Sequence, residues 1–553
     1  MIDDPGTAKP ASLAAENQRL RSQLSALSAR QTQLAYRLER IENSIVFRTL
    51  RAMGAPARRA AWAMRRVRSL FVFDAAHADP AYTSWIRAVD RNAGPEAVSK
   101  AKISIILIGD SPNAEETLHS IGEQTHAALE IRTIRSSSEV RAAVEQSEAE
   151  YIVFAEPGVI LRPFALSAMA AAADAGSSVG RSDVVHCDWD HVDPRGSRHT
   201  PRFTPEYSPE LLSHTLYWGS CFLARRSTVH EVAWPADGEF SLHQLALALS
   251  ARAGRIERIP RILWHQRAKW PVAAYPSDGA PVANFDVVEK ASIVICTRNP
   301  QRIERCLRLL APQSESRPEI IVLMHGAGPG SELERIVSRY NGIAVPYDGG
   351  FDFAHMNRLA ARAASRDVLV FMNDDVYPIA PDWLPRMVAK ATQPVIGAVG
   401  ALLSYPSGAI QHAGIVVGGF PGPTNIGSID RIQRYWPWLA MSRDVSAVTG
   451  ACLAIRREVW DELGGFDSRF PVNYNDVDLC FRARERGYRV VLESMASLVH
   501  EESQTRLPVV RPEELEQFTE LWSELQIRPD PFFHPALTLV AQDIQLVPPR
   551  QCR

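Results

Sequence analysis

One pattern occurs twice in this chain, and it constrains the fold more than any other feature of the sequence. Each copy contains a run of apolar residues, a turn, a helical stretch and two further apolar runs. The runs are residues 103–108, 129–134 and 151–154 in the first copy, and 292–296, 319–324 and 368–372 in the second. Short apolar runs that alternate with helical stretches indicate a parallel sheet covered by helices. The sequence therefore predicts two α/β domains in tandem.

The third run of the second copy ends in a cluster of polar residues. Val368 to Met372 is followed at once by Asn373, Asp374 and Asp375. In open α/β sheets, ligands bind beyond the carboxyl ends of the strands. Adjacent carboxylates are hard oxygen ligands that suit Mg²⁺ or Mn²⁺, and such an ion can bind a diphosphate. The alternative is an ordinary polar turn, because Asn and Asp are common turn residues.

Length and charge bound the organisation of the chain. Its 553 residues are too many for a single hydrophobic core. The net charge of -2 provides no overall field that attracts nucleic acid, so we expect no nucleic-acid partner. The expected segments are a coiled coil (1–45), a basic amphipathic linker (46–100), a first α/β domain (101–270), a linker rich in Pro and Ala (271–285), a second α/β domain (286–535) and a C-terminal tail (536–553).

Residues 13–45 carry a heptad pattern. Leu or Ile recurs every seven residues at positions 13, 20, 27, 34 and 41, and polar residues, Asn17 and Gln31, interrupt the second apolar position. This pattern predicts a short parallel coiled coil and therefore a homodimer formed through residues 13–45. A single amphipathic helix that folds back on its own chain is the alternative.

The segment from Phe47 to Phe73 is basic and contains no acidic residue. Arginines alternate there with apolar and aromatic residues, a composition that an anionic membrane surface attracts. A nucleic-acid site is a weaker explanation, because no aromatic stacking platform accompanies the charge, and a solvated linker is a third. The seven cysteines are scattered without metal-ligand spacing, and no apolar segment reaches the length of a membrane span. These features predict a cytoplasmic protein on the inner face of the plasma membrane.

Five segments of the second copy, taken in order, resemble the inverting GT-A glycosyltransferases of family 2. The form they resemble is the tandem-domain form of bacterial polysaccharide and O-antigen assembly. The segments are residues 370–376 (VFMNDDV), 410–419 (IQHAGIVVGG), 448–470, 472–489 and 498–506 (LVHEESQTR). The resemblance covers roughly residues 101 to 535. It implies two GT-A domains, each with a Rossmann-like and mostly parallel sheet, and metal-dependent transfer of a hexosyl-type sugar from a nucleotide-sugar donor to a saccharide or lipid-linked saccharide acceptor.

The resemblance also implies roles for individual residues. Asp375, Asp374 and His500 would bind Mg²⁺ or Mn²⁺, and Asp476 would be the catalytic base. The implied donor-binding residues are Thr297, Arg298, Asn299, Asn357 and Asn373. The implied acceptor-side residues are Thr449, Gly450, Trp436, Trp438 and Asp478.

Local sequence refines three of these expectations. Asp476 lies in the first turn of a helix expected from Asn473 or Asn475 to Gly487, and a helix N-terminus stabilises a carboxylate. We therefore expect Asp476 to be ionised and a weak base. Asp478 cannot share its helix face, and we expect it to orient Arg482 or the loop. The indoles of Trp436 and Trp438 would either stack on a sugar or fill the core.

The sequence departs from the family in two places. Met324, His325 and Gly326 stand where the family has an acidic residue that binds the nucleotide base, which leaves the donor nucleotide open. In the first copy, Glu156 is the single carboxylate at the position of the metal cluster. Asp188 and Asp190 would then belong either to a second active site, making the enzyme bifunctional, or to a scaffold, which we favour. A non-catalytic carbohydrate-binding or assembly protein built on two decayed domains is the other alternative.

Overall fold

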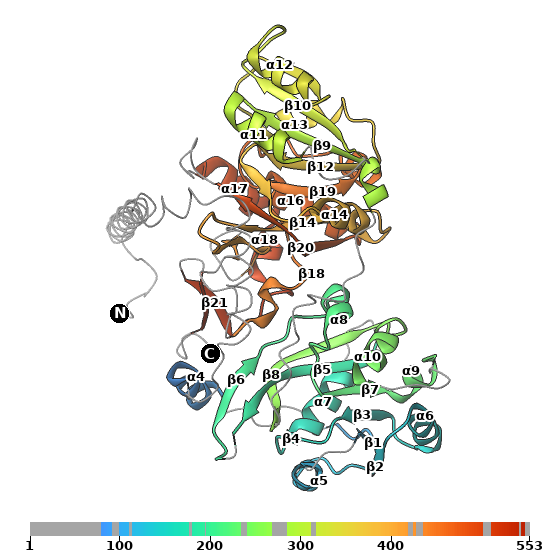
Figure 1. The fold of residues 1–553 in the computed structure, drawn as a ribbon. Coiled ribbons are helices and arrows are strands. Elements are labelled where there is room, and N and C mark those ends of the chain that lie inside the picture. Colours follow the sequence, from blue (N-terminus) through green and yellow to red (C-terminus); the bar gives the residue numbers. More distant parts are fainter. Residues whose placement is uncertain are drawn as a thin grey trace, which may run out of the picture. The chain divides into compact units, whose positions relative to one another are not determined.

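The structure is a computed structural model of the chain (Figure 1). It describes residues 79–90, 99–109, 113–175, 180–193, 195–233, 241–267, 285–310, 317–418, 424–426, 435–501, 510–540 and 543–547. The expected coiled coil, the homodimer formed through it and the basic segment at 47–73 lie outside the described residues. Among the described residues, no helix is long and apolar enough to cross a membrane.

The first α/β domain is built on a mixed sheet. Its strands are β1 (Ile103–Ile108), β2 (Glu130–Ile134), β3 (Tyr151–Ala155), β4 (Val159–Leu161), β5 (Val184–Val192), β6 (Arg198–Arg202), β7 (Cys221–Arg225) and β8 (Ile256–Gln266). They lie in the order β2-β1-β3-β7-β5-β8-β4, and β6 pairs with β5. The helices are α5 (Ala114–Gly122), α6 (Ser137–Gln146), α7 (Ala165–Asp174), α8 (Pro209–His214), α9 (Arg226–His230) and α10 (Leu242–Ser250).

The second α/β domain contains the larger sheet. Its strands are β9 (Ala291–Thr297), β10 (Glu319–His325), β11 (Ile343–Tyr347), β12 (Val368–Asn373), β13 (Val376–Pro378), β14 (Ile396–Ser404), β15 (Ile410–His412), β18 (Arg443–Asp444), β19 (Cys452–Arg456) and β20 (Arg489–His500). The order is β11-β10-β9-β12-β19-β14-β20-β13, with β15 beside β14 and β18 beside β20. The helices are η2 (Phe285–Lys290), α11 (Pro300–Leu310), α12 (Glu332–Arg339), α13 (Phe353–Ala361), α14 (Trp383–Ala391), α15 (Arg457–Leu463) and α16 (Asn475–Glu485).

Seven strands of each sheet follow the same topology, and β11, at the edge of the second sheet, has no counterpart in the first. β1, β2 and β3 correspond to β9, β10 and β12, and β7, β5, β8 and β4 correspond to β19, β14, β20 and β13. The senses of pairing agree as well: β3–β7 and β12–β19 are antiparallel, and β5–β8 and β14–β20 are parallel. The predicted tandem of α/β domains is confirmed by this repeat. The expected mostly parallel sheets are mixed instead, because β7 and β19 run antiparallel to both of their neighbours.

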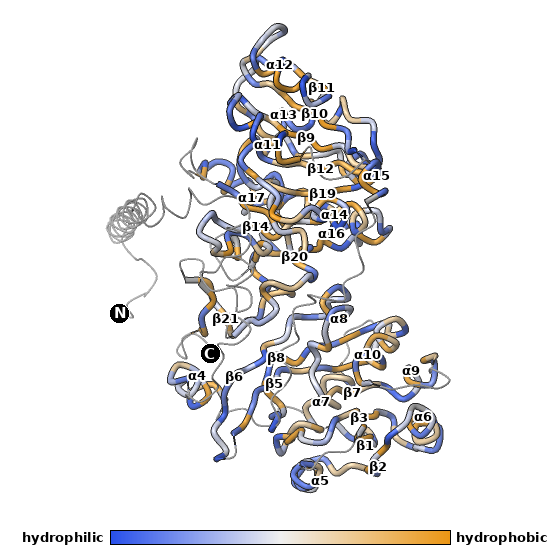
Figure 2. The backbone as a smooth tube through the Cα atoms, in the orientation of Figure 1, coloured by the Kyte–Doolittle hydropathy of each residue, from blue (hydrophilic) through white to orange (hydrophobic). Residues whose placement is uncertain are grey.

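The strand β12 shows why an uninterrupted apolar run forms the centre of this sheet. Val368 and Val370 pack into one hydrophobic cluster, whereas Leu369 and Phe371 pack into another on the opposite face. Helices α11, α12 and α14 supply buried residues to the first cluster, and α13 and α16 supply them to the second. Figure 2 shows hydrophobic residues concentrated along these inner strands. A strand buried on both faces needs no polar alternation.

The folded part extends beyond both domain limits expected from the sequence. Helix α4 (Pro80–Trp85) lies within the expected linker, and its Tyr82 hydroxyl donates a hydrogen bond to Asp190 at 2.6 Å. After helices α17 (Pro512–Leu521) and α18 (Ser523–Ile527), strands β21 (Leu537–Val540) and β22 (Asp543–Leu546) form a hairpin within the expected C-terminal tail.

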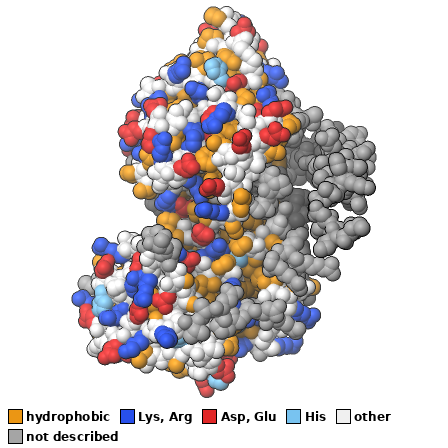
Figure 3. All heavy atoms as spheres, turned by 180° about the vertical axis from the view of Figure 1, so that it is seen from behind, with side chains coloured by type: hydrophobic (Ala, Val, Ile, Leu, Met, Phe, Trp, Pro, Cys, Tyr) orange, Lys and Arg blue, Asp and Glu red, His pale blue; other side chains and the backbone are white. Residues whose placement is uncertain are grey.

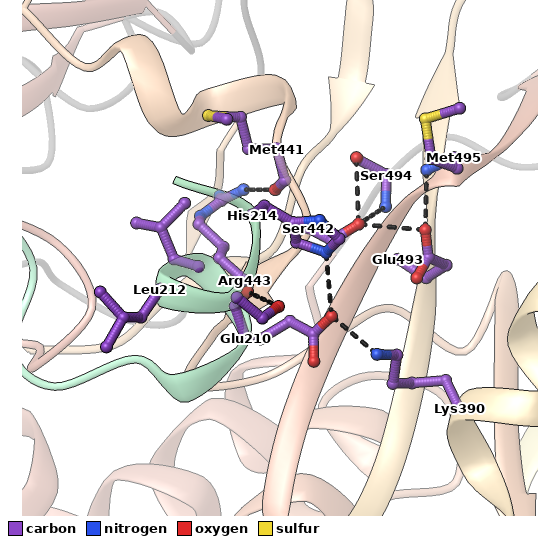
Figure 4. Close-up of polar contacts among 12 residues, drawn as sticks. Glu210, Leu212, His214, Lys390, Met441, Ser442, Arg443, Glu493, Ser494 and Met495 are labelled. Atoms are coloured by element: carbon purple, nitrogen blue, oxygen red, sulfur yellow. Dashed lines mark hydrogen bonds and ion pairs between the residues drawn. The ribbon is translucent and has the colours of Figure 1, made fainter. Parts of the chain in front are cut away.

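Helix α8 of the first domain contacts the second domain through buried polar groups (Figure 4). Lys390 Nζ donates a hydrogen bond to Glu210 Oε1 at 2.7 Å, and Ser208 Oγ donates to Asp444 at 2.7 Å. Arg489, the first residue of β20, donates to the same Asp444 at 2.6 Å. The first domain therefore binds the strand that ends, eleven residues later, at His500.

On the molecular face drawn in Figure 3, basic and acidic side chains are interspersed. Such mixing agrees with the near-zero net charge of the chain. Each of the six cysteines that the structure describes carries a free thiol.

Candidate active site

The acidic cluster lies at the carboxyl edge of the second sheet, where β9 and β12 end side by side. The Thr297 hydroxyl at the end of β9 donates a hydrogen bond to Asp374 Oδ2 at 2.6 Å. Arg302, in the first turns of α11, places Nη1 3.9 Å from Asp374 and 3.8 Å from Asp375. Thr297, predicted to bind the donor, thus positions a carboxylate here.

Asp375 and His500 meet, although 125 positions separate them in the sequence. Strand β13 pairs with β20 so that Val376 lies opposite His500, and His500 Nε2 is 3.3 Å from Asp375 Oδ1. Burial alone would raise the pKa of Asp375, but the contacts with His500 and Arg302 outweigh it and lower that pKa. Asp375 is thus held as a carboxylate.

Asp374 has the opposite tendency. Burial raises its pKa, the adjacent Asp375 raises it further, and the hydrogen bond from Thr297 opposes both effects. The pKa values of the two neighbouring carboxyl groups are thus shifted in opposite directions. Together the two groups concentrate negative charge, which favours a bound cation.

Asp476 lies at the start of α16, as predicted, but its environment differs from the expected one. The residue that precedes the helix is Tyr474, in a left-handed conformation (φ 62°), and not one of the two asparagines. Asp476 accepts hydrogen bonds from the N–H groups of Gly450 at 2.7 Å and Val477 at 2.9 Å. Burial nevertheless raises its pKa, so Asp476 is a stronger base than the helix N-terminus alone predicts.

A short hydrogen-bonded path places Asp476 at the same edge as the acidic cluster. The N–H of Asn373 donates to the carbonyl of Ala451 at 3.0 Å. Gly450, which precedes Ala451 in the chain, donates its N–H to the Asp476 carboxylate. The two carboxylate groups that the sequence assigned to metal and base thus converge from β12 and α16.

Asp478 faces away from this edge. It is fully buried and accepts hydrogen bonds from Arg482 Nε at 2.8 Å and Trp522 Nε1 at 3.2 Å. Arg482 in turn donates to the carbonyls of Leu463 and Gly465. Asp478 therefore orients Arg482, as expected. Through Arg482 it supports the segment that contains Leu463 and Gly465, on the predicted acceptor side.

Three predicted contact residues are core residues instead. Trp436 and Trp438 are 0% and 4% exposed, so neither indole can stack on a sugar. Trp438 Nε1 donates to the carbonyl of Phe203 in the first domain at 2.8 Å. Asn357 is 2% exposed and donates to the carbonyl of Phe353 in its own helix at 2.9 Å. Aromatic and amide side chains are common in cores and in sites, and burial distinguishes the two cases.

The remaining predicted residues stay near the edge. Asn299 accepts from the N–H of Arg302 at 3.0 Å and so begins α11, while Arg298 is exposed beside it. The N–H of Thr449 donates to His412 Nε2 at 3.4 Å. Gly450 lies against Asp476 and Phe353, where a Cβ would be 3.5 Å from each.

Two residues of the site were not predicted from the sequence. Arg302 was not singled out, although its place in the first turn of the helix after β9 is a usable signal. Gln411 accepts a hydrogen bond from His500 Nδ1 at 2.7 Å, and nothing in the sequence links two residues 89 positions apart.

The donor set fits a divalent ion, although the described residues contain no cluster of three or more His, Cys, Asp or Glu side chains arranged around one point. The 3.3 Å between Asp375 Oδ1 and His500 Nε2 is close to the ~3.0 Å that separates neighbouring ligands of an octahedral ion with bonds near 2.1 Å. Asp374 is the next carboxylate within reach of the same edge.

The first domain lacks these groups at every matching position. Ala155 pairs with Cys221 as Met372 pairs with Cys452, so Glu156, Pro157 and Gly158 stand in place of Asn373, Asp374 and Asp375. Val159 pairs with Gln266 as Val376 pairs with His500, which places Gln266 where the histidine would be. Helix α10, in the place of α16, has no acidic residue in its first turn.

Asp188 and Asp190 do not form a second active site. Both are 0% exposed. Asp188 accepts from the N–H of Thr204 at 2.8 Å and lies 2.7 Å from His534 Nε2. Asp190 accepts from Tyr82, Arg198 and His265. Both carboxylates make hydrogen bonds and ionic contacts within the protein, which favours the scaffold interpretation of the first domain.

Comparisons with known proteins agree with this division. The family model described as "Glycosyltransferase like family 2" matches residues 290–518. The O-antigen biosynthesis protein RfbC of Myxococcus xanthus is 29% identical over an alignment of 500 residues, and the alignment covers 80% of this chain and 38% of that protein. The N-acetylglucosaminyl-diphospho-decaprenol L-rhamnosyltransferase of Mycobacterium tuberculosis is 25% identical over an alignment of 245 residues, and the alignment covers 38% of this chain and 75% of that protein.

A solved structure of GalNAc-T7 with UDP, GalNAc and Mn²⁺ is similar at 14% sequence identity and a TM-score of 0.36, over 47% of this chain and 50% of that chain. The chain spans about two fifths of the length of RfbC.

Proposed function

Residues 290–518 of this chain form a glycosyltransferase family 2 domain, and on that premise we propose that the second α/β domain transfers a sugar, with inversion, from a nucleotide-sugar donor to a saccharide acceptor. One observation carries the proposal. The paired carboxylates of β12, the histidine of β20 and the carboxylate of α16 meet at the carboxyl edge of one sheet.

Asp476 is the proposed catalytic base. Its raised pKa lets it take a proton from an acceptor hydroxyl, and the N–H groups of Gly450 and Val477 hold its oxygens in a fixed direction. The hydroxyl oxygen then attacks the anomeric carbon from the face opposite the diphosphate, which gives inversion. General-base help of this kind contributes about 10²- to 10⁴-fold to the rate.

Asp375 and His500, with Asp374 beside them, would hold Mg²⁺ or Mn²⁺. When bound, such an ion supplies positive charge against the leaving diphosphate. Arg302 adds a fixed positive charge 3.8 Å from Asp375, and the Thr297 hydroxyl keeps Asp374 directed at the same edge. Arg298 and Asn299 lie where the donor would enter.

The names of two relatives support a proposal for the acceptor class. RfbC is named for O-antigen biosynthesis, and the mycobacterial relative is named for a diphospho-decaprenol-linked sugar acceptor. We extend this to the present chain as a lipid-linked saccharide of a cell-surface polysaccharide. The basic segment at residues 47–73 would bring the enzyme to the inner face of the plasma membrane, and residues 13–45 would join two copies.

Release of nucleoside diphosphate from UDP-, GDP- and dTDP-sugars with Mn²⁺ tests the proposal, using the wild type and Asp375→Ala. We expect one donor to be consumed by the wild type and not by the variant, with both proteins folded. Consumption of no donor, together with no metal-dependent nucleotide binding, would contradict it and would favour a carbohydrate-binding protein.

A further inference from the structure

We propose that Gln411 is a positioning residue that fixes the ring of His500 for metal binding. The inference rests on the proposed function, because it concerns the histidine assigned there to the ion. Three features of the structure carry it: the backbone that presents Gln411, the hydrogen bond that it accepts, and the group that His500 faces on its other side.

A β-bulge directs Gln411 toward the site. Strand β15 pairs with β14 so that His412 lies opposite Leu403 and Ile410 lies opposite Ser404. Three residues of one strand therefore face two of the other, and Gln411 is the extra residue. Bulges of this kind change the direction of a side chain and are frequent beside active sites. Gln411 is 6% exposed, so its amide is enclosed by the protein.

The hydrogen bond decides which ring nitrogen carries the proton. His500 Nδ1 is 2.7 Å from Oε1 of Gln411, and a carbonyl oxygen can only accept. Nδ1 is therefore the donor, and the neutral ring presents the lone pair of Nε2 on its opposite side. Metal-binding histidines commonly donate their second N–H to such a partner, which sets the tautomer and the ring orientation.

The group facing that lone pair is an anion. Nε2 lies 3.3 Å from Asp375 Oδ1, so the ring nitrogen that does not bond Gln411 is the one that faces the carboxylate. Gln411 thus keeps Nε2 beside Asp375, where the neutral ring would offer its lone pair to a cation that the carboxylate also binds. The matching position to His500 in the first domain is Gln266.

The test is the affinity for Mn²⁺, measured by electron paramagnetic resonance on the full chain in the presence of UDP. Gln411→Met removes the acceptor, and we expect the Mn²⁺ dissociation constant to rise roughly 10-fold or more. Gln411→Glu keeps an acceptor for Nδ1–H and should remain near the wild type. In a His500→Ala background, Gln411→Met should have no further effect, because its action passes through the ring.

The matched control is Gln266→Met, a glutamine that is 5% exposed in the first domain, and it should leave Mn²⁺ affinity unchanged. Equal affinities of the wild type and Gln411→Met, or an equal loss in the His500→Ala background, would overturn the role of Gln411 alone. A wild type that binds no Mn²⁺ would overturn it together with the metal site. If Gln411→Met does not fold, Gln411→Glu is the variant that tests the proposal. Weaker Mn²⁺ binding by Gln411→Glu than by the wild type would then contradict it.

Discussion

The two α/β domains of this chain share the order of seven strands and differ in the residues at the carboxyl edge of those strands. The strands pair in the same order and sense, but Asn373, Asp374 and Asp375 at the end of β12 are matched by Glu156, Pro157 and Gly158 after β3. Gly158 has a φ of +104°, which L residues rarely adopt, so a carboxylate there would also strain the backbone. A duplicated sheet therefore preserves the fold without preserving the chemistry.

The buried charges differ in the same way. Asp188 and Asp190 of the first domain are enclosed by their own hydrogen-bond partners, whereas Asp374, Asp375 and Asp476 are gathered where strands end. The first domain uses carboxylates to hold its parts together, including α4 through Tyr82 and the C-terminal segment through His534. These contacts favour the scaffold interpretation of the first domain.

The largest expected effect tests the base. Asp476→Asn removes the proton acceptor while keeping its shape, and we expect the transfer rate to fall about 10²- to 10⁴-fold. Steady-state kinetics on the donor found above measure the effect. The matched change Glu156→Gln in the first domain should leave the rate near that of the wild type. A large loss with Glu156→Gln would show that both domains contribute to catalysis.

The next effect concerns stability and compares one aspartate from each domain. Asp190→Ala leaves Arg198 and His265 without their buried anion, and we expect a loss of roughly 3 to 5 kcal/mol in the free energy of unfolding. Chemical denaturation measures it. Asp375→Ala should abolish activity with little loss of stability, because functional sites are seldom optimised for stability. The opposite result for the two variants would reverse the assignment of the domains.

A smaller effect depends on pH. Burial lowers the pKa of His186 well below its usual 6.5, and burial lowers that of His191 to about 4. Between pH 6.5 and about 4, the unfolded chain binds more protons than the folded chain. The stability that the two neutral histidines contribute to the folded state is therefore fully present above pH 6.5 and is lost as the pH falls toward about 4. For His191 this loss amounts to about 3 kcal/mol.

Thermal unfolding between neutral and mildly acidic pH measures the loss. His186→Phe should flatten the pH dependence, since Phe can keep the stacking on Trp218 without binding a proton. The exposed His355 of the second domain provides the control, and His355→Phe should leave the dependence unchanged. An unchanged dependence in His186→Phe would contradict the contribution of His186.

The smallest effect concerns the contact between the domains. Lys390→Met removes one partner of Glu210, while His214 remains 3.2 Å from the same oxygen, so we expect a loss of about 1.5 kcal/mol. Denaturation followed by a probe in each domain measures it. Lys102→Met breaks an exposed pair with Glu148 and should cost less than about 1 kcal/mol. Equal losses would show that burial adds nothing at this contact.

Local patterns in the sequence were sufficient for much of the fold. The apolar runs at 103–108, 292–296 and 368–372 are strands of the two sheets, because strands buried on both faces are continuous in hydrophobicity. The acidic cluster after Met372 and the helix that begins at Asn475 were also evident, since each is encoded by neighbouring residues. The repeat, and with it the tandem of α/β domains, came from the sequence alone.

The tertiary structure decided what distant residues do to one another. Gln411 and His500 are 89 positions apart, and Trp438 meets the carbonyl of Phe203 across 235 positions. Burial, which depends on packing of the whole chain, raised the pKa of Asp476 and assigned the two tryptophans to the core. Desolvation and long-range hydrogen bonds have no local signature, so the sequence indicated which residues carry chemistry, and the fold determined which of them act together.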